Sequence, residues 1–160
     1  MIDIIENLEE LKDYSGGEKK QIVIFQLSGE EYAVDITHSR QIIKLSKITP
    51  VPNTPDYVRG VINLRGQIIP VIDLKKRFSL PDSGEKEKII TVEVRDILIG
   101  LLVDNIKEVL WYDVETELEP APEVIGGVKQ EFVKGIVKRG ERLIVLIDLE
   151  ELLFENSSIV

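Results

Sequence analysis

The chain contains no cysteine and only one histidine, His38, among its 160 residues. The absence of cysteine excludes disulfide bonds, thiolate catalysis and cysteine-based zinc sites. A single histidine excludes a metal centre built from several imidazoles, and Ser39 beside it does not form a catalytic dyad. We therefore interpret His38 as a surface side chain and expect no metal site.

Basic residues are scarce relative to acidic ones: 20 Lys and Arg stand against 29 Asp and Glu, which gives a net charge of −9. Nucleic-acid binding draws its affinity from Lys and Arg, so this balance argues against a nucleic-acid partner. A small-barrel nucleic-acid binder would need a basic face lined with aromatic rings. The chain has only four Phe, four Tyr and one Trp, so we keep this class as a minor alternative.

Long apolar runs are also missing, and none reaches the roughly 18 residues that identify a membrane-spanning helix. The acidic N-terminus lacks the basic region of a secretory signal, so we expect a cytoplasmic protein. Residues 1–20 are predicted to be a tail or a short helix, because apolar side chains in residues 4–11 have helical spacing.

Catalytic motifs are absent as well. The chain has no Gly-rich phosphate loop and no G-x-S-x-G nucleophile elbow. We therefore predict a protein that is not an enzyme and needs no cofactor. A hydrolase with an unrecognised pair of carboxylates remains an alternative, which a buried carboxylate pair with raised pKa values would identify.

Short strands separated by turns make up the rest of the chain, and their order is repeated. The sequence YVRGVINLRGQIIPVIDL (57–74) returns as FVKGIVKRGERLIVLIDL (132–149). Gly60 precedes Gly135 by 75 positions, and Asp73 precedes Asp148 by the same number. Each Asp is expected to cap a short helix. Two blocks of roughly 65 residues therefore constitute an internal duplication.

Several short strands with Gly and Pro turns predict an all-β fold. About five strands per block favour two tandem small antiparallel barrels with short capping helices, a closed form that removes exposed strand edges. We place the first barrel at about 21–80 and the second at about 88–155, with ends that can be exchanged between them. Because each barrel alone would bury a thin core, we expect them to pack as one unit over residues 21–155.

The two blocks differ on one strand face. Glu31 and Asp35 in the first block correspond to Leu98 and Leu102 in the second. These leucines are expected either to form the seam between the barrels or to form an apolar patch for a partner. Arg65 lies in the turn Asn63–Gly66, where Gly66 is expected to adopt a positive φ and Asn63 to stabilise the turn.

These motifs resemble the CheW family of bacterial chemotaxis coupling proteins. The resemblance rests on TPDYVRGVINLRGQIIPVIDL (54–74), GEEYAVDI (29–36) and ILIGLLVDNIKEVL (97–110), and it covers roughly residues 20–155. It implies two five-stranded SH3-like barrels and an adaptor that binds two partners, the regulatory domain of the chemotaxis histidine kinase and the cytoplasmic tip of methyl-accepting receptors. It further implies recruitment to membrane-associated receptor arrays. An adaptor of a kinase pathway outside motility, such as pilus control, would have the same sequence features.

The resemblance also implies site residues. In this family the receptor helix lies in a groove between the barrels, and the kinase contact belongs mainly to the second barrel. We expect the kinase contact at Leu98 and Leu102. Family members commonly carry V-x-E-I where this chain has Ser39-Arg40-Gln41-Ile42, so this part of the receptor contact is expected to differ. The residues assigned to the receptor contact are Arg65, Gly60, Asn63, Gln41, Ile42, Ile106 and Val109.

Overall fold

A computed structural model describes residues 18–84, 86–125 and 128–155. The helix expected near the N-terminus lies outside these residues. The described chain is mostly strands in two main sheets with a few short helical turns, which confirms the all-β prediction. Among the described residues, no helix is long and apolar enough to cross a membrane.

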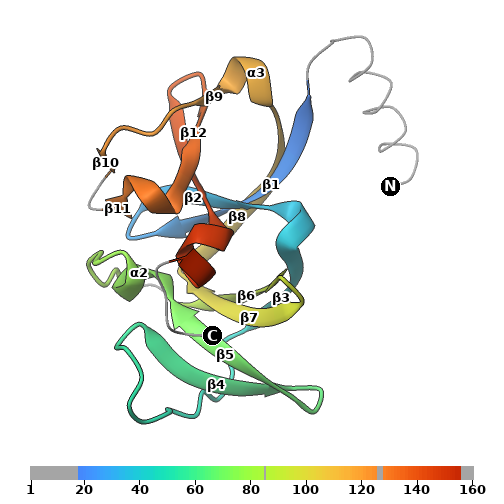
Figure 1. Ribbon diagram of the computed structural model, residues 1–160, viewed down its shortest axis with the longest axis vertical. Helices are drawn as coiled ribbons and strands as arrows, with labels where there is room; N and C mark the ends of the chain where they lie inside the picture. The colour runs from blue at the N-terminus through green and yellow to red at the C-terminus, as the bar shows by residue number, and fades with distance from the viewer. Residues whose placement is uncertain (1–17, 85, 126–127, 156–160) are drawn as a thin grey trace.

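The larger sheet has six strands in the order β8-β1-β2-β13-β12-β9. It occupies the upper part of the molecule in Figure 1. Its strands are β1 (Lys19–Leu27), β2 (Glu30–Asp35), β8 (Asn105–Asp113), β9 (Leu118–Glu119), β12 (Val133–Arg139) and β13 (Arg142–Ile147).

The second sheet has five strands in the order β3-β6-β7-β5-β4 and lies below the first in Figure 1. Its strands are β3 (Ser39–Lys44), β4 (Val58–Leu64), β5 (Gln67–Asp73), β6 (Lys88–Val94) and β7 (Ile97–Val103). A separate small hairpin consists of β10 (Val124–Ile125) and β11 (Val128–Lys129). The short helical turns are η1 (Ile36–His38), α2 (Leu74–Arg77), α3 (Val114–Glu117), η2 (Gln130–Phe132) and η3 (Glu151–Glu155).

The division of the strands between the two sheets does not follow the boundary between the repeats at residues 80–88. The first repeat supplies β1 to β5, and the second supplies β6, β7, β8, β12 and β13. Each sheet takes the first two strands of one repeat and the last three of the other, so the exchange of strands is reciprocal. The strands of the two repeats pair antiparallel between β1 and β8 and between β3 and β6. They pair parallel between β2 and β13 and between β5 and β7, which departs from the all-antiparallel expectation.

Both barrels close at a glycine. At Gly60, with φ +142°, an added Cβ would lie 2.2 Å from Thr49 O, because Thr49 pairs with the neighbouring Val61. At the equivalent Gly135, an added Cβ would lie 2.6 Å from Glu119 O in β9. Each glycine also sits at a register shift between paired strands. The two glycines therefore permit the close backbone approach that completes each barrel.

Apolar side chains form three cores. One lies within each barrel, and the most extensive lies between the sheets. The central core combines Phe25 and Tyr32 of the first sheet with Val92 and Leu101 of the second. Because strand side chains alternate between faces, each sheet contributes one face to its own barrel and the other to this shared core. The barrels are therefore packed as one unit, as expected from their size.

The predicted helix caps are present in both repeats. The Asp73 carboxylate accepts a hydrogen bond from Lys76 N at 3.2 Å, and the Asp148 carboxylate accepts one from Glu151 N at 3.2 Å. These bonds satisfy backbone donors that have no partner inside the short helical turns.

Candidate partner-binding surfaces

The tip of the β4–β5 hairpin carries Arg65 on a two-residue turn. Arg65 has φ +54° and Gly66 has φ +85°, as a type I′ turn requires. The Asn63 carboxamide oxygen accepts a hydrogen bond from Gly66 N at 2.9 Å, so Asn63 stabilises the turn. The Arg65 side chain is exposed and has no ion pair or hydrogen bond with any described residue. The structure therefore presents a free guanidinium at this tip.

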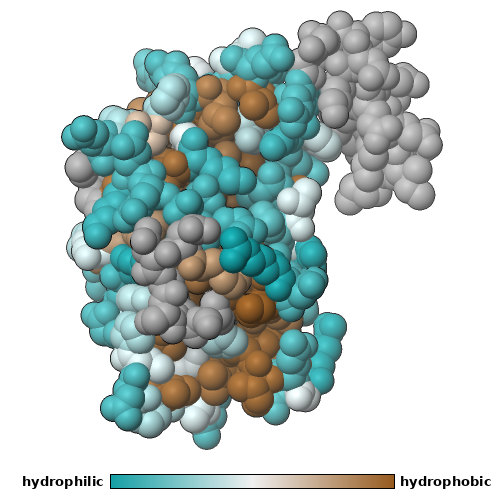
Figure 2. Space-filling model, in the orientation of Figure 1, coloured by the Kyte–Doolittle hydropathy of each residue, from teal (hydrophilic) through white to brown (hydrophobic). Residues whose placement is uncertain are grey.

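Ile68, beside this turn, is the most exposed large apolar side chain of the described residues, with 61% of its surface accessible. Figure 2 shows apolar surface in the lower part of the molecule, over the region of β4 and β5. Ile68 is not among the site residues predicted from the sequence. Its signal is the alternation in β5, since the buried Ile69 and Val71 leave Ile68 on the opposite face.

The edge strands β3 and β8 place three predicted residues on faces directed toward the central core. Ile42 pairs with the buried Ile90, and Val109 pairs with Val23. Ile42 and Val109 remain 51% and 47% exposed, whereas Ile106 is partly buried against the core. Gln41 pairs with Thr91 and lies on the opposite face of β3 from Ile42. The structure therefore does not group Gln41 with the other three.

A cavity of about 310 Å³ joins β8 to η1, the turn that leads into β3. Trp111 lines it from β8, and Ile36 and Thr37 line it from η1. Trp111 is on the same face of β8 as Val109, two residues away. Trp111 is not among the residues predicted from the sequence, although its spacing from Val109 indicates the shared face.

At the departure from the family pattern, Arg40 occupies a polar environment. Its guanidinium donates to Thr37 O at 2.9 Å and lies 3.5 Å from the Glu93 carboxylate. The side chain of Arg40 therefore contacts η1 and β6, which is the neighbour of β3 in the second sheet.

Two predicted contact residues have internal positions. Gly60 is buried and serves barrel closure, so it supports the hairpin and offers no side chain to a partner. Leu102 is fully buried in the core of its own barrel with Ile62 and Ile89. Leu98 is partly buried against the same core. The expectation of a seam or partner patch at these leucines is wrong for Leu102, because it fills the barrel interior on the face opposite the seam.

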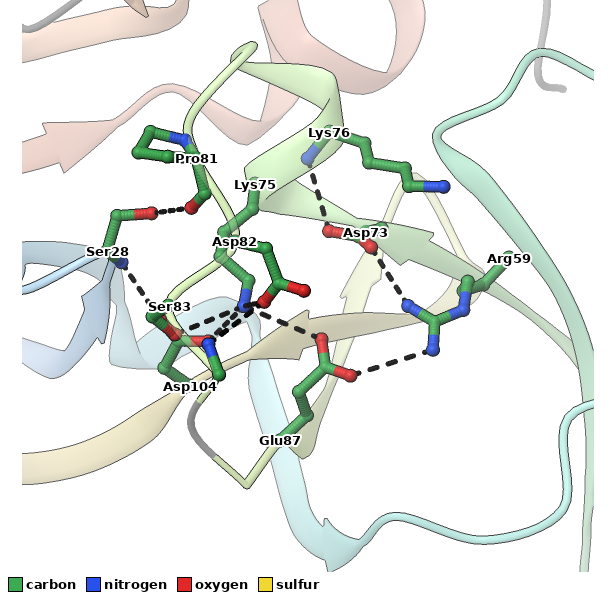
Figure 3. A network of polar contacts seen from close by, with 11 residues as sticks. Ser28, Arg59, Asp73, Lys75, Lys76, Pro81, Asp82, Ser83, Glu87 and Asp104 are labelled. Atoms are coloured by element: carbon green, nitrogen blue, oxygen red, sulfur yellow. Dashed lines mark hydrogen bonds and ion pairs between the residues drawn. The ribbon is translucent and has the colours of Figure 1, made fainter.

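A polar network surrounds α2 and the loop that follows it (Figure 3). Lys75 Nζ lies 2.5 Å from the Asp104 carboxylate, and both side chains are almost completely buried. Asp104 also accepts hydrogen bonds from Ser28 N and Ser83 Oγ, each at 2.8 Å. Asp104 lies between β7 and β8, where the chain passes from one sheet to the other. The network therefore stabilises the point at which the chain crosses from the second sheet to the first.

A cavity of about 450 Å³ opens beside this network. Arg59 lines it and lies 3.0 Å from the Asp73 carboxylate and 3.6 Å from that of Glu87. The cationic side chains that line this cavity are therefore largely paired with carboxylates. Burial alone would lower the pKa of Lys75, but Asp104 and its acidic neighbours outweigh this effect and raise that pKa. Burial raises the pKa of Glu87 despite the nearby Arg59 and Lys75.

Among the described residues, no group of three or more His, Cys, Asp or Glu side chains could hold a metal ion. His38 Nδ1 lies 3.3 Å from Glu93 O, so the ring interacts with the backbone of β6. The described surface carries exposed apolar side chains on its strands and a free arginine at a hairpin tip. These groups favour non-covalent binding of a partner.

These features define a two-barrel binding module, and the chain belongs to the CheW-like domain family, which matches residues 21–156. It is similar to the chemotaxis protein CheW of Bacillus subtilis strain 168, with 40% identity over 144 residues, 89% of this chain and 90% of the relative. The chemotaxis protein CheW of Treponema pallidum is 35% identical over 141 residues, 84% of this chain and 82% of that protein. The crystal structure of the scaffolding protein TtCheW from Thermoanaerobacter tengcongensis matches with a TM-score of 0.78 at 43% identity, over 84% of this chain and 88% of that one. The family resemblance and the two-barrel fold are thereby confirmed.

Proposed function

We propose that the protein is a non-enzymatic adaptor that couples chemoreceptors to the chemotaxis histidine kinase and helps to build their array. Its relatives carry the names chemotaxis protein and scaffolding protein. The observation that carries the proposal is the β4–β5 tip, where an unpaired Arg65 lies close to the exposed Ile68. Arginine and exposed apolar side chains are typical of interface hot spots.

We assign the receptor contact to the surface between β3 and β8. Ile42, Val109 and the cavity beside Trp111 supply apolar area there, and an amphipathic receptor helix would bury it. Arg65 would fix the orientation of the receptor through hydrogen bonds to carbonyl or carboxylate oxygens. Asn63 supports Arg65 by holding the turn.

We assign the kinase contact to the apolar surface at Ile68, with Leu98 as a partly buried neighbour of the same barrel. The equivalent position in the other barrel is Leu143, which is 54% exposed. An adaptor that links several partners needs more than one docking surface. The duplicated fold supplies two such apolar positions, Ile68 and Leu143. Partners bound there would recruit the protein to membrane-associated arrays.

The test is a calorimetric titration with the isolated regulatory domain of a chemotaxis histidine kinase from the same genome. We expect micromolar or tighter binding, about −8 kcal/mol. Ile68→Ser should weaken this binding about tenfold or more, and Lys88→Ser is the control at an exposed position on β6. A folded protein that gives no binding heat at several temperatures would refute the kinase contact.

The receptor assignment is tested separately with a helical fragment of a receptor tip. Val109→Glu and Arg65→Ala should each weaken capture of this fragment, and Val109→Glu should leave kinase binding unchanged. The control is Lys134→Ala, at an exposed position on β12, which is not a neighbour of β3 or β8. Equal capture by all variants would refute this surface.

A further inference from the structure

Arg77 is the only arginine besides Arg65 that has no ion pair with a described residue. Of the seven arginines in the chain, the other five each lie within 4 Å of a carboxylate. Arg65 is exposed at a hairpin tip, where water can hydrate it. Arg77 is only partly exposed, and its Nε atom is buried without a hydrogen-bond partner among the described residues. A desolvated N–H donor of this kind is costly unless something binds it.

Two aromatic rings enclose the Arg77 guanidinium. Its Cζ lies 4.8 Å from the centre of the Tyr57 ring and 4.4 Å from that of Phe132. Both distances are within the range of cation–π interaction, which stabilises the charge without using the N–H groups. These contacts thus hold the guanidinium between the two rings and leave its N–H donors for a ligand.

A small cavity of about 140 Å³ lies against this arginine. A second cation, Lys129, lines it, together with Ser79 and Phe132. No carboxylate lines the cavity among the described residues, although the chain has a net charge of −9. The larger cavity beside Lys75 differs in this respect, since Asp73, Asp82 and Glu87 accompany its cations.

The size of the cavity limits its ligand. Water occupies about 30 Å³ per molecule, so this space equals that of roughly four or five waters. Phosphate has five non-hydrogen atoms, and a carboxylate with one methylene has four. Arginine matches the geometry of such oxyanions through paired N–H donors, and a nearby lysine adds a point charge.

We propose that Arg77 and Lys129 form an oxyanion-binding site for a phosphate or carboxylate group. Arg77 comes from α2, which follows the second sheet, whereas Lys129 and Phe132 lead into β12 of the first. A bound oxyanion would therefore bridge the two barrels. Figure 1 shows α2 and β11 on the side of the molecule away from η1 and β3. The site is thus separate from the surface assigned to the receptor and does not depend on the proposed adaptor function.

The test is a titration of the isotope-labelled protein with inorganic phosphate, followed by amide and arginine Nε–H NMR signals. We expect saturable shifts at Arg77, Ser79, Lys129 and Phe132, and none with potassium chloride at the same ionic strength. A parallel titration with N-acetylglutamate amide distinguishes a protein side-chain carboxylate from free phosphate as the source of the oxyanion. Saturable binding of either probe at these residues supports the site.

Arg77→Met should weaken binding about tenfold or more, since it keeps the aliphatic stem and removes the charged donors. Lys76→Met is the matched control, because it removes one positive charge from the neighbouring exposed position of α2. If Arg77→Met does not fold, Lys129→Gln must show weakened binding with intact structure. Shifts identical to those with chloride, or equal losses in the Arg77 and Lys76 variants, would overturn the site and leave Arg77 as a stacking residue only.

Discussion

The two long hairpins occupy equivalent positions in the two repeats but use their tips differently. At the β12–β13 tip, Arg139 donates to the Glu117 carboxylate at 2.8 and 2.9 Å and to Trp111 O at 2.8 Å. Arg142 lies 3.0 Å from the carboxylates of both Glu31 and Glu108. The β4–β5 tip has no such anchor among the described residues, and its Arg65 faces solvent. Duplication therefore provided one hairpin fixed to its own barrel and one available for another molecule.

The same contrast appears two residues after each capping Asp. Lys75 and Glu150 are 75 positions apart and occupy equivalent sites in the two short helices. Lys75 is buried against Asp104, whereas Glu150 forms an exposed ion pair with Arg95 at 2.8 Å. Equivalent positions thus carry either a structural ion pair or a solvated one.

The largest expected effect is at the closing glycines. Gly60→Ala should destabilise the protein by about 4 kcal/mol or more, because the Cβ collides with a backbone carbonyl at an unfavourable φ. Gly135→Ala should cost about 2 kcal/mol, because no positive φ adds to its contact. Chemical denaturation measures both values. Gly140→Ala is the control, since its positive φ has nothing within 4 Å and should cost about 1 kcal/mol. Equal losses at positions 60 and 140 would show that closure does not depend on this approach.

Lys75→Met should cost about 3 kcal/mol, because it leaves the Asp104 carboxylate buried without its cation. Glu150→Ala should change stability by no more than about 0.5 kcal/mol, because its ion pair is exposed. Urea unfolding of both variants measures the difference. The double variant K75M/D104N should regain part of the loss, whereas a further loss would contradict the pairing of these two charges.

Substitutions at the two exposed apolar positions, Ile68 and Leu143, should have different effects on kinase binding. Ile68→Ser should weaken kinase binding by about tenfold, or 1.4 kcal/mol, whereas Leu143→Ser should weaken it less. Both variants should keep the melting temperature, because each side chain is more than half exposed. Equal effects on binding would mean that the barrels are interchangeable toward the kinase.

The smallest effect concerns the anchored tip at low pH. Hydrogen bonds from Arg139 lower the pKa of Glu117, so its ionised form stabilises the folded state. This contribution is present above the ordinary pKa of 4.5 and is lost as the pH falls through the lower folded value. Thermal melts of Glu117→Gln should show less than about 1 kcal/mol of loss at neutral pH and convergence with the parent in acid. A difference that persists in acid would point to packing instead.

Local patterns sufficed to predict the duplication, both capping aspartates and the tight turn at Arg65. Ile42 and Val109 were assigned to the receptor contact only through the family resemblance, and that assignment stays a prediction. Local patterns could not assign strands to barrels, because hydrophobic alternation states which residues share a face but not which sheet the strand joins. For this reason Leu102 was expected at a surface or seam, whereas it fills a barrel interior. Ile68 was missed because both faces of β5 are apolar, so its alternation with Ile69 does not by itself say which face is exposed.

The reciprocal exchange of strands has a consequence for the order of synthesis. The second sheet contains only β3 to β7, so all its strands are available once the chain has emerged as far as Val103. The first sheet pairs Tyr32 with Val145 and must wait for nearly the whole chain. On the ribosome, the β1–β2 hairpin is therefore made early and completed last. Its exposed apolar faces make it the segment that most needs protection from other chains until translation ends.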